Sequence, residues 1–200
     1  QMSVPELTDI SAEPQHVLDL YGQDVTRPGT FAANCLLARR LAERDVRVVQ
    51  IFHRGWDQHG SLPKDLSNQC RDVDQGSAAL VKDLKQRGLL DSTVVHWGGE
   101  MGRLPVIQND TGVKNVGRDH NTYGFSMWVA GGGFKAGGTY GATDEFGHRA
   151  VENIVNHFDY HATLLHLFGL LPEKLTYKQN GREQTLLDGQ SGKVVAGLLA

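Results

Sequence analysis

Apolar side chains recur at helical spacing in three parts of this 200-residue chain. Residues 31–45, FAANCLLARRLAERD, place an apolar stripe on one side and arginines and a glutamate opposite, which predicts an amphipathic helix. The block from about 69 to 90 repeats this pattern and stops at Gly88. Residues 159–170, DYHATLLHLFGL, predict a further helix closed by Gly169. Three sizeable helices are therefore expected.

Short runs rich in β-branched and aromatic residues predict three strands, at 46–53, 92–99 and 125–133. The first, VRVVQIFH, is expected to be buried. Because a helix separates the first two strands, the order predicts a βαβ crossover, and hence an α/β fold with a mainly parallel sheet flanked by helices. Near the end of the chain, Asn180-Gly181 predicts a turn or short hairpin.

Length and composition predict one domain over residues 1–200. A hydrophobic content of 40% and a charged content of 22% are ordinary for a globular chain that buries one core. Residues 1–30 are expected to form an irregular leader, and residues 171–200 a tail that packs on the core.

Charge and hydropathy exclude two classes of partner. A formal net charge of −3 provides no basic face for nucleic acid. The longest apolar runs span a few residues, far short of the roughly 20 that cross a bilayer, so no membrane insertion is expected. Cys35 and Cys70 lack CxxC spacing, so a metal or redox pair is not expected from them. The oligomeric state is not fixed by the sequence.

Common catalytic signatures are missing from the chain. It contains no GxSxG elbow, no GxxxxGK[ST] phosphate loop and no GxGxxG opening a helix after a strand. The glycines at 131–133 lead into a further loop, so a phosphate-binding role for them is not favoured.

The stretch GWDQHG places Asp57 and His59 directly after the first predicted strand. If the chain is still extended there, residues two apart project to the same side, and a carboxylate and an imidazole can hold one ion. This mixed ligation suits Zn²⁺, Mn²⁺ or Fe. The alternative is a simple turn in which Asp57 and His59 pair with each other.

The stretch WGGEMGR places Glu100 and Arg103 after the second predicted strand. These two side chains can form a salt bridge. The other interpretation makes Glu100 a third metal ligand and Arg103 a planar donor to an oxyanion such as phosphate or sulfate.

A loop motif, GRDHN, adds Asp119 and His120. In open α/β sheets ligands bind at the carboxyl ends of strands, so this loop is expected to return to the same edge as the two earlier motifs. The joint prediction is a metal site formed by Asp57, His59, Glu100 and His120. Asp119 is expected to orient a ligand histidine through a hydrogen bond.

Other polar residues receive weaker expectations. His53 lies at the end of the first predicted strand, and the pattern does not decide whether its side chain faces the site. His96 lies within a predicted strand and is most simply a hydrogen-bonded core residue. Asp159 is expected to cap the amino terminus of the last sizeable helix.

Together these motifs resemble the carboxyl-terminal part of a bacterial family known as domain of unknown function fifteen-oh-one, whose members are often labelled sulfatase-like. The resemblance rests on GWDQHG, GLLDSTVVHWGGEMGRLP, GRDHN, GFSMWVAGGGFKAGGTYGATDEFG, FDYHATLLHLFGL and LTYKQNGREQTL, which keep the family's order over nearly the whole chain.

That family in turn resembles the alkaline phosphatase and sulfatase superfamily. The resemblance implies an α/β hydrolase of phosphate or sulfate esters, with one or two metal ions beside a nucleophilic Ser, Thr or formylglycine. It matches Asp57 and His59 to the superfamily's Asp and His ligand pair, Glu100 to the neighbourhood of its Asp-His dipeptide, and His120 to its last ligand histidine.

Two departures from the superfamily pattern are evident. The Asp-to-His spacing is shorter than the usual Asp-x-x-x-His, and Gly99-Glu100 replaces an Asp-His pair, which removes one ligand. The resemblance also implies that the nucleophile belongs to an amino-terminal portion this chain lacks, so that the chain is a partial domain. Full-length relatives suggest export to the periplasm or cell exterior.

The expected function is therefore a metal-dependent hydrolase of sulfate or phosphate esters, or the metal-binding portion of such a hydrolase. The expected substrate is a small-molecule or polysaccharide ester. The expected cofactor is a divalent ion, Zn²⁺, Mn²⁺, Ca²⁺ or Mg²⁺, and Arg103 and Asp119 are the candidate catalytic residues. The alternative is a non-catalytic relative that binds sulfated polysaccharide or a protein partner. A third interpretation is purely structural, with the charged residues as internal pairs.

Overall fold

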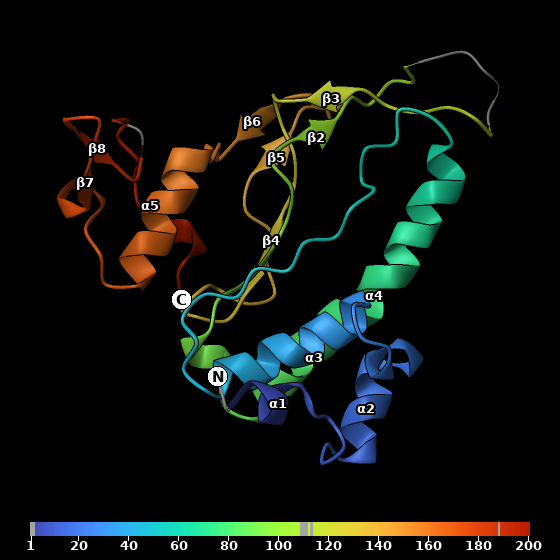
Figure 1. Cartoon of the computed structure of the whole chain (residues 1–200). Coiled ribbons are helices and arrows are strands. Elements are labelled where there is room, and N and C mark those ends of the chain that lie inside the picture. Colours follow the sequence, from blue (N-terminus) through green and yellow to red (C-terminus); the bar gives the residue numbers. More distant parts are fainter. Residues whose placement is uncertain (1–2, 109–111, 113, 188) are drawn as a thin grey trace. The chain divides into compact units, whose positions relative to one another are not determined.

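The computed structural model describes residues 3–108, 112, 114–187 and 189–200 of the chain (Figure 1). The chain divides into two compact units. The first holds Gln1–Val95 and Arg103–His120, and the second holds His96–Gly102 and Asn121–Ala200. Within the described ranges, no helix has both the length and the apolar character needed to cross a membrane.

Helices dominate the first unit. They are α1 (Ser3–Thr8), α2 (Gln15–Tyr21), the 3₁₀ turn η1 (Gln23–Thr26), α3 (Phe31–Ala42), α4 (Leu62–Gln86) and the 3₁₀ turn η2 (Leu90–Ser92). The predicted helices at 31–45 and 69–90 correspond to α3 and α4, and α4 begins earlier than expected. The leader that was expected to be irregular contains α1, α2 and η1.

Helices α3 and α4 pack closely against each other in the first unit (Figure 1). The hydroxyl of Thr30 caps α3 by accepting a hydrogen bond from the backbone N–H of Ala33. Gly76 of α4 permits the close approach, because a Cβ there would lie 3.1 Å from the Phe31 ring and 3.2 Å from the Ala32 Cα. Seven buried apolar residues of this unit form one cluster: Val17, Tyr21, Val25, Ala32, Cys35, Leu36 and Ala79.

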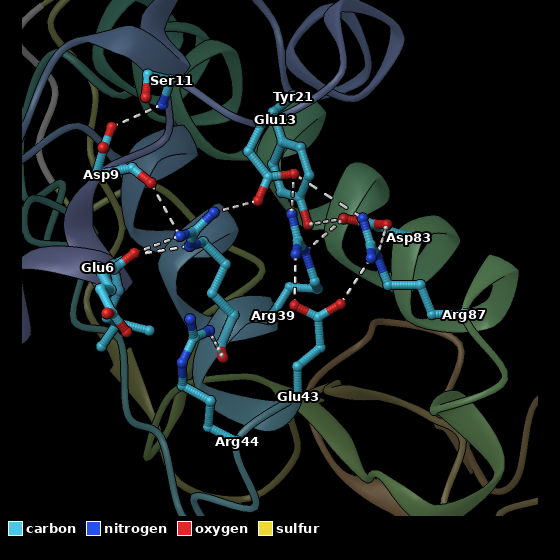
Figure 2. Close-up of polar contacts among 12 residues, drawn as sticks. Glu6, Asp9, Ser11, Glu13, Tyr21, Arg39, Glu43, Arg44, Asp83 and Arg87 are labelled. Carbon is cyan, nitrogen blue, oxygen red and sulfur yellow. Dashed lines mark hydrogen bonds and ion pairs between the residues drawn. The ribbon is translucent and has the colours of Figure 1, made fainter. Parts of the chain in front are cut away.

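The arginines of α3 do not face solvent, contrary to the amphipathic prediction. Arg39 has only 2% of its surface exposed, because three carboxylates surround it: Glu13 and Glu43 at 2.6 Å and Asp83 at 2.9 Å. Figure 2 shows this buried network converging from three segments of the first unit. A buried charge is tolerated when it is paired and hydrogen-bonded in this way.

The strands are short, and they pair two by two in four antiparallel sheets. The pairs are β1 (Val95–Trp97) with β4 (Trp128–Ala130), β2 (Gly102–Arg103) with β3 (His120–Asn121), β5 (Ala142–Thr143) with β6 (Ala150–Glu152), and β7 (Thr176–Gln179) with β8 (Arg182–Thr185). The remaining elements of the second unit are α5 (His157–Leu167), η3 (Pro172–Lys174) and η4 (Ala196–Leu198).

The prediction of an α/β fold with a mainly parallel sheet is wrong. The described residues are 38% helical and hold no parallel sheet. Residues 46–53, the expected first buried strand, form no strand, and most of them are exposed. Helix α4 therefore does not connect two paired strands, and the part of the chain that the structure describes contains no βαβ crossover. The predicted strands at 92–99 and 125–133 survive as β1 and β4, which pair with each other.

Three local predictions in the second unit have clear outcomes. The turn at Asn180-Gly181 is confirmed, because both residues have positive φ, at 51° and 76°, and join β7 to β8. Helix α5 confirms the helix expected over 159–170. Its cap, however, is the side chain of Asn156, which accepts from the backbone N–H of Asp159, so Asp159 is not the cap.

Candidate metal centre

Two segments about sixty residues apart lie side by side in the first unit and build the site. The backbone N–H of Arg118 donates to the carbonyl of Gln58 at 3.1 Å, and that of Leu62 donates to the carbonyl of Val116 at 2.9 Å. Gly117 is required between these contacts, because a Cβ there would lie 2.0 Å from the carbonyl carbon of His59. This close approach brings His120 toward GWDQHG.

Asp57, His59 and His120 form one group of potential ligands. Each contributes one atom, and these atoms all lie within 4.8 Å of one another. The Nε2 atoms of both histidines lie 2.9 Å from Asp57 Oδ1. Arg103 Nη2 lies 2.7 Å from the same oxygen. A single carboxylate oxygen is thus shared by two imidazoles and a guanidinium.

The group is open to solvent. The Asp57 side chain is 64% exposed, so ions and small ligands can reach its carboxylate directly. Hydrogen bonds from His120 and Arg103 lower the pKa of Asp57 to about 2, and the nearby charges of His59 and Arg103 act in the same direction. Asp57 is therefore an ionised carboxylate at neutral pH.

The second ring nitrogen of His59 has its own partner. His59 Nδ1 lies 2.6 Å from Gln108 Oε1, an acceptor, so Nδ1 carries the hydrogen of this bond. A neutral imidazole protonated at Nδ1 presents a lone pair at Nε2. His59 Nε2 lies 2.9 Å from Asp57 Oδ1, so the ring of His59 lies between Gln108 and Asp57.

Arg103 contacts Asp57, whereas the alternative prediction was a salt bridge with Glu100. Its Nη2 donates to the carbonyl of Trp56 at 2.9 Å as well as to Asp57, while its Nη1 is buried and has no hydrogen-bond partner among the described residues. The expected alternative of an internal Asp57–His59 pair is also present in the contact between Oδ1 and Nε2. The site therefore combines that pair with two further groups.

The other predicted site residues lie elsewhere or act differently. Glu100 is an exposed residue of the second unit and is not a member of the Asp57 group, so its role as a ligand stays a prediction. Asp119 Oδ1 accepts from the backbone N–H of His120 at 2.7 Å, a contact with the main chain and not with the imidazole. Its catalytic role also stays a prediction.

Two histidines outside the group have clear partners. His53 Nδ1 accepts from the indole N–H of Trp56, and its ring contacts Phe31 edge to face. In the second unit, His96 Nδ1 lies 2.7 Å from the Tyr160 hydroxyl. Burial lowers the pKa of His96, and the nearby His161 adds to this effect.

Sequence reasoning missed Gln108. It follows Arg103 in a segment without periodicity, and an isolated glutamine carries no motif that marks it as a partner of His59. Only the fold of the loop identifies it.

Comparison with known proteins identifies a family. A family model described as "Protein of unknown function (DUF1501)" matches residues 1–199 of the chain. Searches of curated proteins and of solved structures found no match.

Proposed function

Starting from the fact that the chain belongs to the family described as "Protein of unknown function (DUF1501)", we propose that Asp57, His59 and His120 bind a divalent metal ion. We further propose that this site serves the hydrolysis of sulfate or phosphate esters, as the catalytic metal centre or as the metal-binding portion of a larger one. The observation that carries the proposal is the convergence of one carboxylate oxygen and two imidazole nitrogens within 4.8 Å.

The donor set fits a first-row divalent ion. One carboxylate and two imidazoles suit Zn²⁺ or Mn²⁺ better than the all-oxygen shells that Ca²⁺ and Mg²⁺ prefer. Bonds of about 2.0–2.1 Å in tetrahedral geometry separate neighbouring ligands by roughly 3.3 Å. The 2.9 Å separations from Asp57 Oδ1 therefore need to widen by only about 0.4 Å.

The number of ligands favours a catalytic role over a structural one. Structural zinc sites are closed by four protein ligands, whereas catalytic sites keep three and leave a position open. Here three described side chains form the group, and the exposed carboxylate leaves room for a further ligand.

The chain's own residues have distinct tasks in this proposal. Gln108 holds the hydrogen of His59 on Nδ1 and so keeps Nε2 directed at the ion. The guanidinium of Arg103, whose Nη2 lies 2.7 Å from Asp57 Oδ1, is the proposed donor for a non-bridging oxygen of the anionic ester. A bound divalent ion supplies Lewis-acid polarisation of such an oxygen.

The charge balance agrees with an anionic substrate. Asp57 and Arg103 carry opposite unit charges, so neutral histidines and a divalent ion leave the group with a net charge of about +2. Sulfate and phosphate esters are attracted to such a site, whereas cationic substrates are repelled.

Metal binding tests the proposal directly. Calorimetric titration with Zn²⁺ and Mn²⁺, together with elemental analysis, is expected to show one ion per chain for the wild type and strongly reduced binding for Asp57→Ala and His120→Ala. Asp74→Ala and His16→Ala change exposed residues of the same unit outside the group and should bind normally. Unchanged metal content in both site variants contradicts the proposal.

Ester hydrolysis tests the proposal that the site is catalytic. With Zn²⁺ or Mn²⁺ bound, model sulfate and phosphate esters should be hydrolysed by the wild type and not by Asp57→Ala. Metal binding without turnover of either ester would overturn the proposal that this chain is itself the hydrolase, and would leave the metal-binding portion of a larger site and the non-catalytic alternative.

A further inference from the structure

His53 holds the side chain of Trp56, the residue that precedes Asp57. The indole N–H of Trp56 donates to His53 Nδ1 at 3.0 Å, and the two rings meet edge to face with centroids 5.9 Å apart. Because Nδ1 is the acceptor, the hydrogen of a neutral His53 lies on Nε2. That nitrogen lies 3.5 Å from Asp72 Oδ2 of α4. These contacts favour the tautomer of His53 whose Nδ1 accepts from Trp56.

Helices α3 and α4 fix the position of the His53 ring. The ring contacts Phe31 of α3 edge to face, with centroids 5.6 Å apart. The His53 side chain is 19% exposed, whereas that of Asp57 is 64% exposed. Gly55 lets the chain pass close to α4, because its φ is +96° and a Cβ there would lie 2.3 Å from Gln69 Nε2. His53 is therefore anchored on the helices, while Asp57 extends toward solvent.

Trp56 links the anchored His53 ring to the candidate metal centre. Its carbonyl oxygen accepts from Arg103 Nη2 at 2.9 Å, and the same nitrogen lies 2.7 Å from Asp57 Oδ1. This carbonyl belongs to the planar peptide group that joins Trp56 to Asp57. A rotation of that peptide would move the acceptor of the guanidinium and the carboxylate together. Restraining the Trp56 side chain therefore restrains both groups.

The alternative is that His53 serves only as packing between Phe31 and Trp56. Packing depends on the faces and edges of the ring, so another flat ring of similar size would replace the imidazole. Positioning depends on the Nδ1 acceptor, because the indole N–H is the only hydrogen-bonding group of a tryptophan side chain. The two roles therefore use different parts of His53, and substitutions can separate them.

We infer that His53 is a positioning residue of the candidate metal centre. Through the indole of Trp56 it fixes the peptide between Trp56 and Asp57, and so holds the Arg103 guanidinium against the Asp57 carboxylate. The inference rests on the proposed function, because the groups that His53 positions are those assigned there to the metal ion and the anionic ester.

Two substitutions of His53 separate positioning from packing. His53→Phe keeps a ring against Phe31 and removes the acceptor, whereas His53→Asn removes the ring and keeps an acceptor oxygen near the place of Nδ1. In titration calorimetry we expect about 10-fold weaker Zn²⁺ binding for His53→Phe and near wild-type binding for His53→Asn. A packing role predicts the reverse order. Zn²⁺ binding by His53→Phe that is as tight as that of His53→Asn, or tighter, overturns the inference.

Trp56→Phe tests whether His53 acts through the indole. This variant removes the donor and keeps an aromatic ring, so its Zn²⁺ affinity should fall as in His53→Phe. The double variant should fall no further, because each substitution removes the same hydrogen bond. Additive losses overturn the inference. His16→Phe changes an exposed histidine of the same unit and should bind Zn²⁺ as the wild type does.

NMR of the metal-free protein follows the same contacts directly. In the ¹⁵N-labelled wild type, a coupling across the hydrogen bond is expected between Trp56 Nε1 and His53 Nδ1. The Nη hydrogens of Arg103, assigned with Arg103→Lys, should give resolved signals at low temperature, because two acceptors hold the guanidinium. His53→Phe should lose the Arg103 signals and His53→Asn should keep them. Arg103 signals that are missing from the wild type, or unchanged in His53→Phe, overturn the inference.

These measurements distinguish failure of the inference from failure of the proposed function. A wild type that binds no Zn²⁺, but whose Arg103 signals disappear in His53→Phe, contradicts the metal site and supports the positioning role. Equal Zn²⁺ affinities of the wild type and His53→Phe contradict the positioning role and leave the metal site intact.

Discussion

Gln108 Oε1 lies 2.6 Å from His59 Nδ1, and this contact sets which nitrogen of His59 faces Asp57. Partners of this kind typically change metal affinity by about 10–100-fold when they are removed. We expect Gln108→Leu to weaken Zn²⁺ binding by that factor. Titration calorimetry measures the change, and ¹⁵N NMR of the metal-free protein should show less of the His59 tautomer protonated at Nδ1.

Gln108→Glu is the matched control for this prediction. Glutamate retains an acceptor oxygen of the same reach, so the tautomer and the affinity should be preserved. Equal affinities of the wild type and Gln108→Leu would show that the contact does not orient His59.

Gly117→Ala should disrupt the contact between the two site segments. Its Cβ would overlap the His59 backbone, and overpacking of this kind costs about 1–3 kcal/mol. We expect reduced stability in urea unfolding together with weaker Zn²⁺ binding. Gly138→Ala is the control, because no atom lies within 4 Å of the added Cβ and its φ is not positive. If both variants matched the wild type, the close approach would not be essential.

Asp83→Asn should destabilise the first unit strongly. Asp83 accepts from Arg39, Tyr21 and Arg87, and removing its charge leaves the buried Arg39 guanidinium short of a counter-charge (Figure 2). Breaking one partner of a buried pair costs about 3–5 kcal/mol, which urea unfolding can measure.

The exposed pair of Arg27 and Asp24 provides the comparison. These groups lie 2.7 Å apart but are well solvated, so Asp24→Asn should cost no more than about 1 kcal/mol. Similar costs for the two substitutions would mean that burial does not control the strength of the network.

The pH dependence of stability should carry a contribution from Glu13. Burial raises its pKa, but hydrogen bonds and charge from Arg39 and Arg40 outweigh this and hold the pKa below the ordinary value. Between the folded and unfolded pKa values the unfolded state binds more protons. This stabilisation is therefore complete above the unfolded value of about 4.3 and is lost as pH falls through the folded pKa.

Urea unfolding across pH 3–7 checks this contribution. Glu13→Gln should lower stability near pH 7 and show a shallower decline below about pH 4.3 than the wild type. Glu145→Gln, at an exposed loop position, should keep the wild-type slope. Parallel curves for the wild type and Glu13→Gln would refute the assignment.

Local patterns predicted the helices better than the strands. Apolar spacing suffices for α3 and α5, because a helix satisfies its own backbone. A strand needs the backbone hydrogen bonds of a neighbouring strand, and the local sequence VRVVQIFH does not show whether such a strand lies beside it. The prediction of a parallel sheet is wrong for this reason, although residues 46–53 are indeed rich in β-branched side chains.

The candidate site was predictable in part for a similar reason. Asp57, His59 and His120 stand out as polar residues in glycine-containing loops, and the structure brings them together. The parallel-sheet edge that was expected to unite them is not found among the described residues, and backbone contacts between residues 58–62 and 115–118 bring them together instead. Gln108 and the burial of Arg39 depend on tertiary neighbours, which composition does not reveal.

Glu13, which precedes α2, contacts both Arg39 and Arg40 of α3, so this early segment stabilises the first unit. A shortened version beginning at α3 would retain both guanidinium groups and lose the carboxylate that bridges them. Removal of the first thirty residues should therefore lower the stability of the first unit. Natural variation at position 13 should also be coupled to variation at positions 39 and 40.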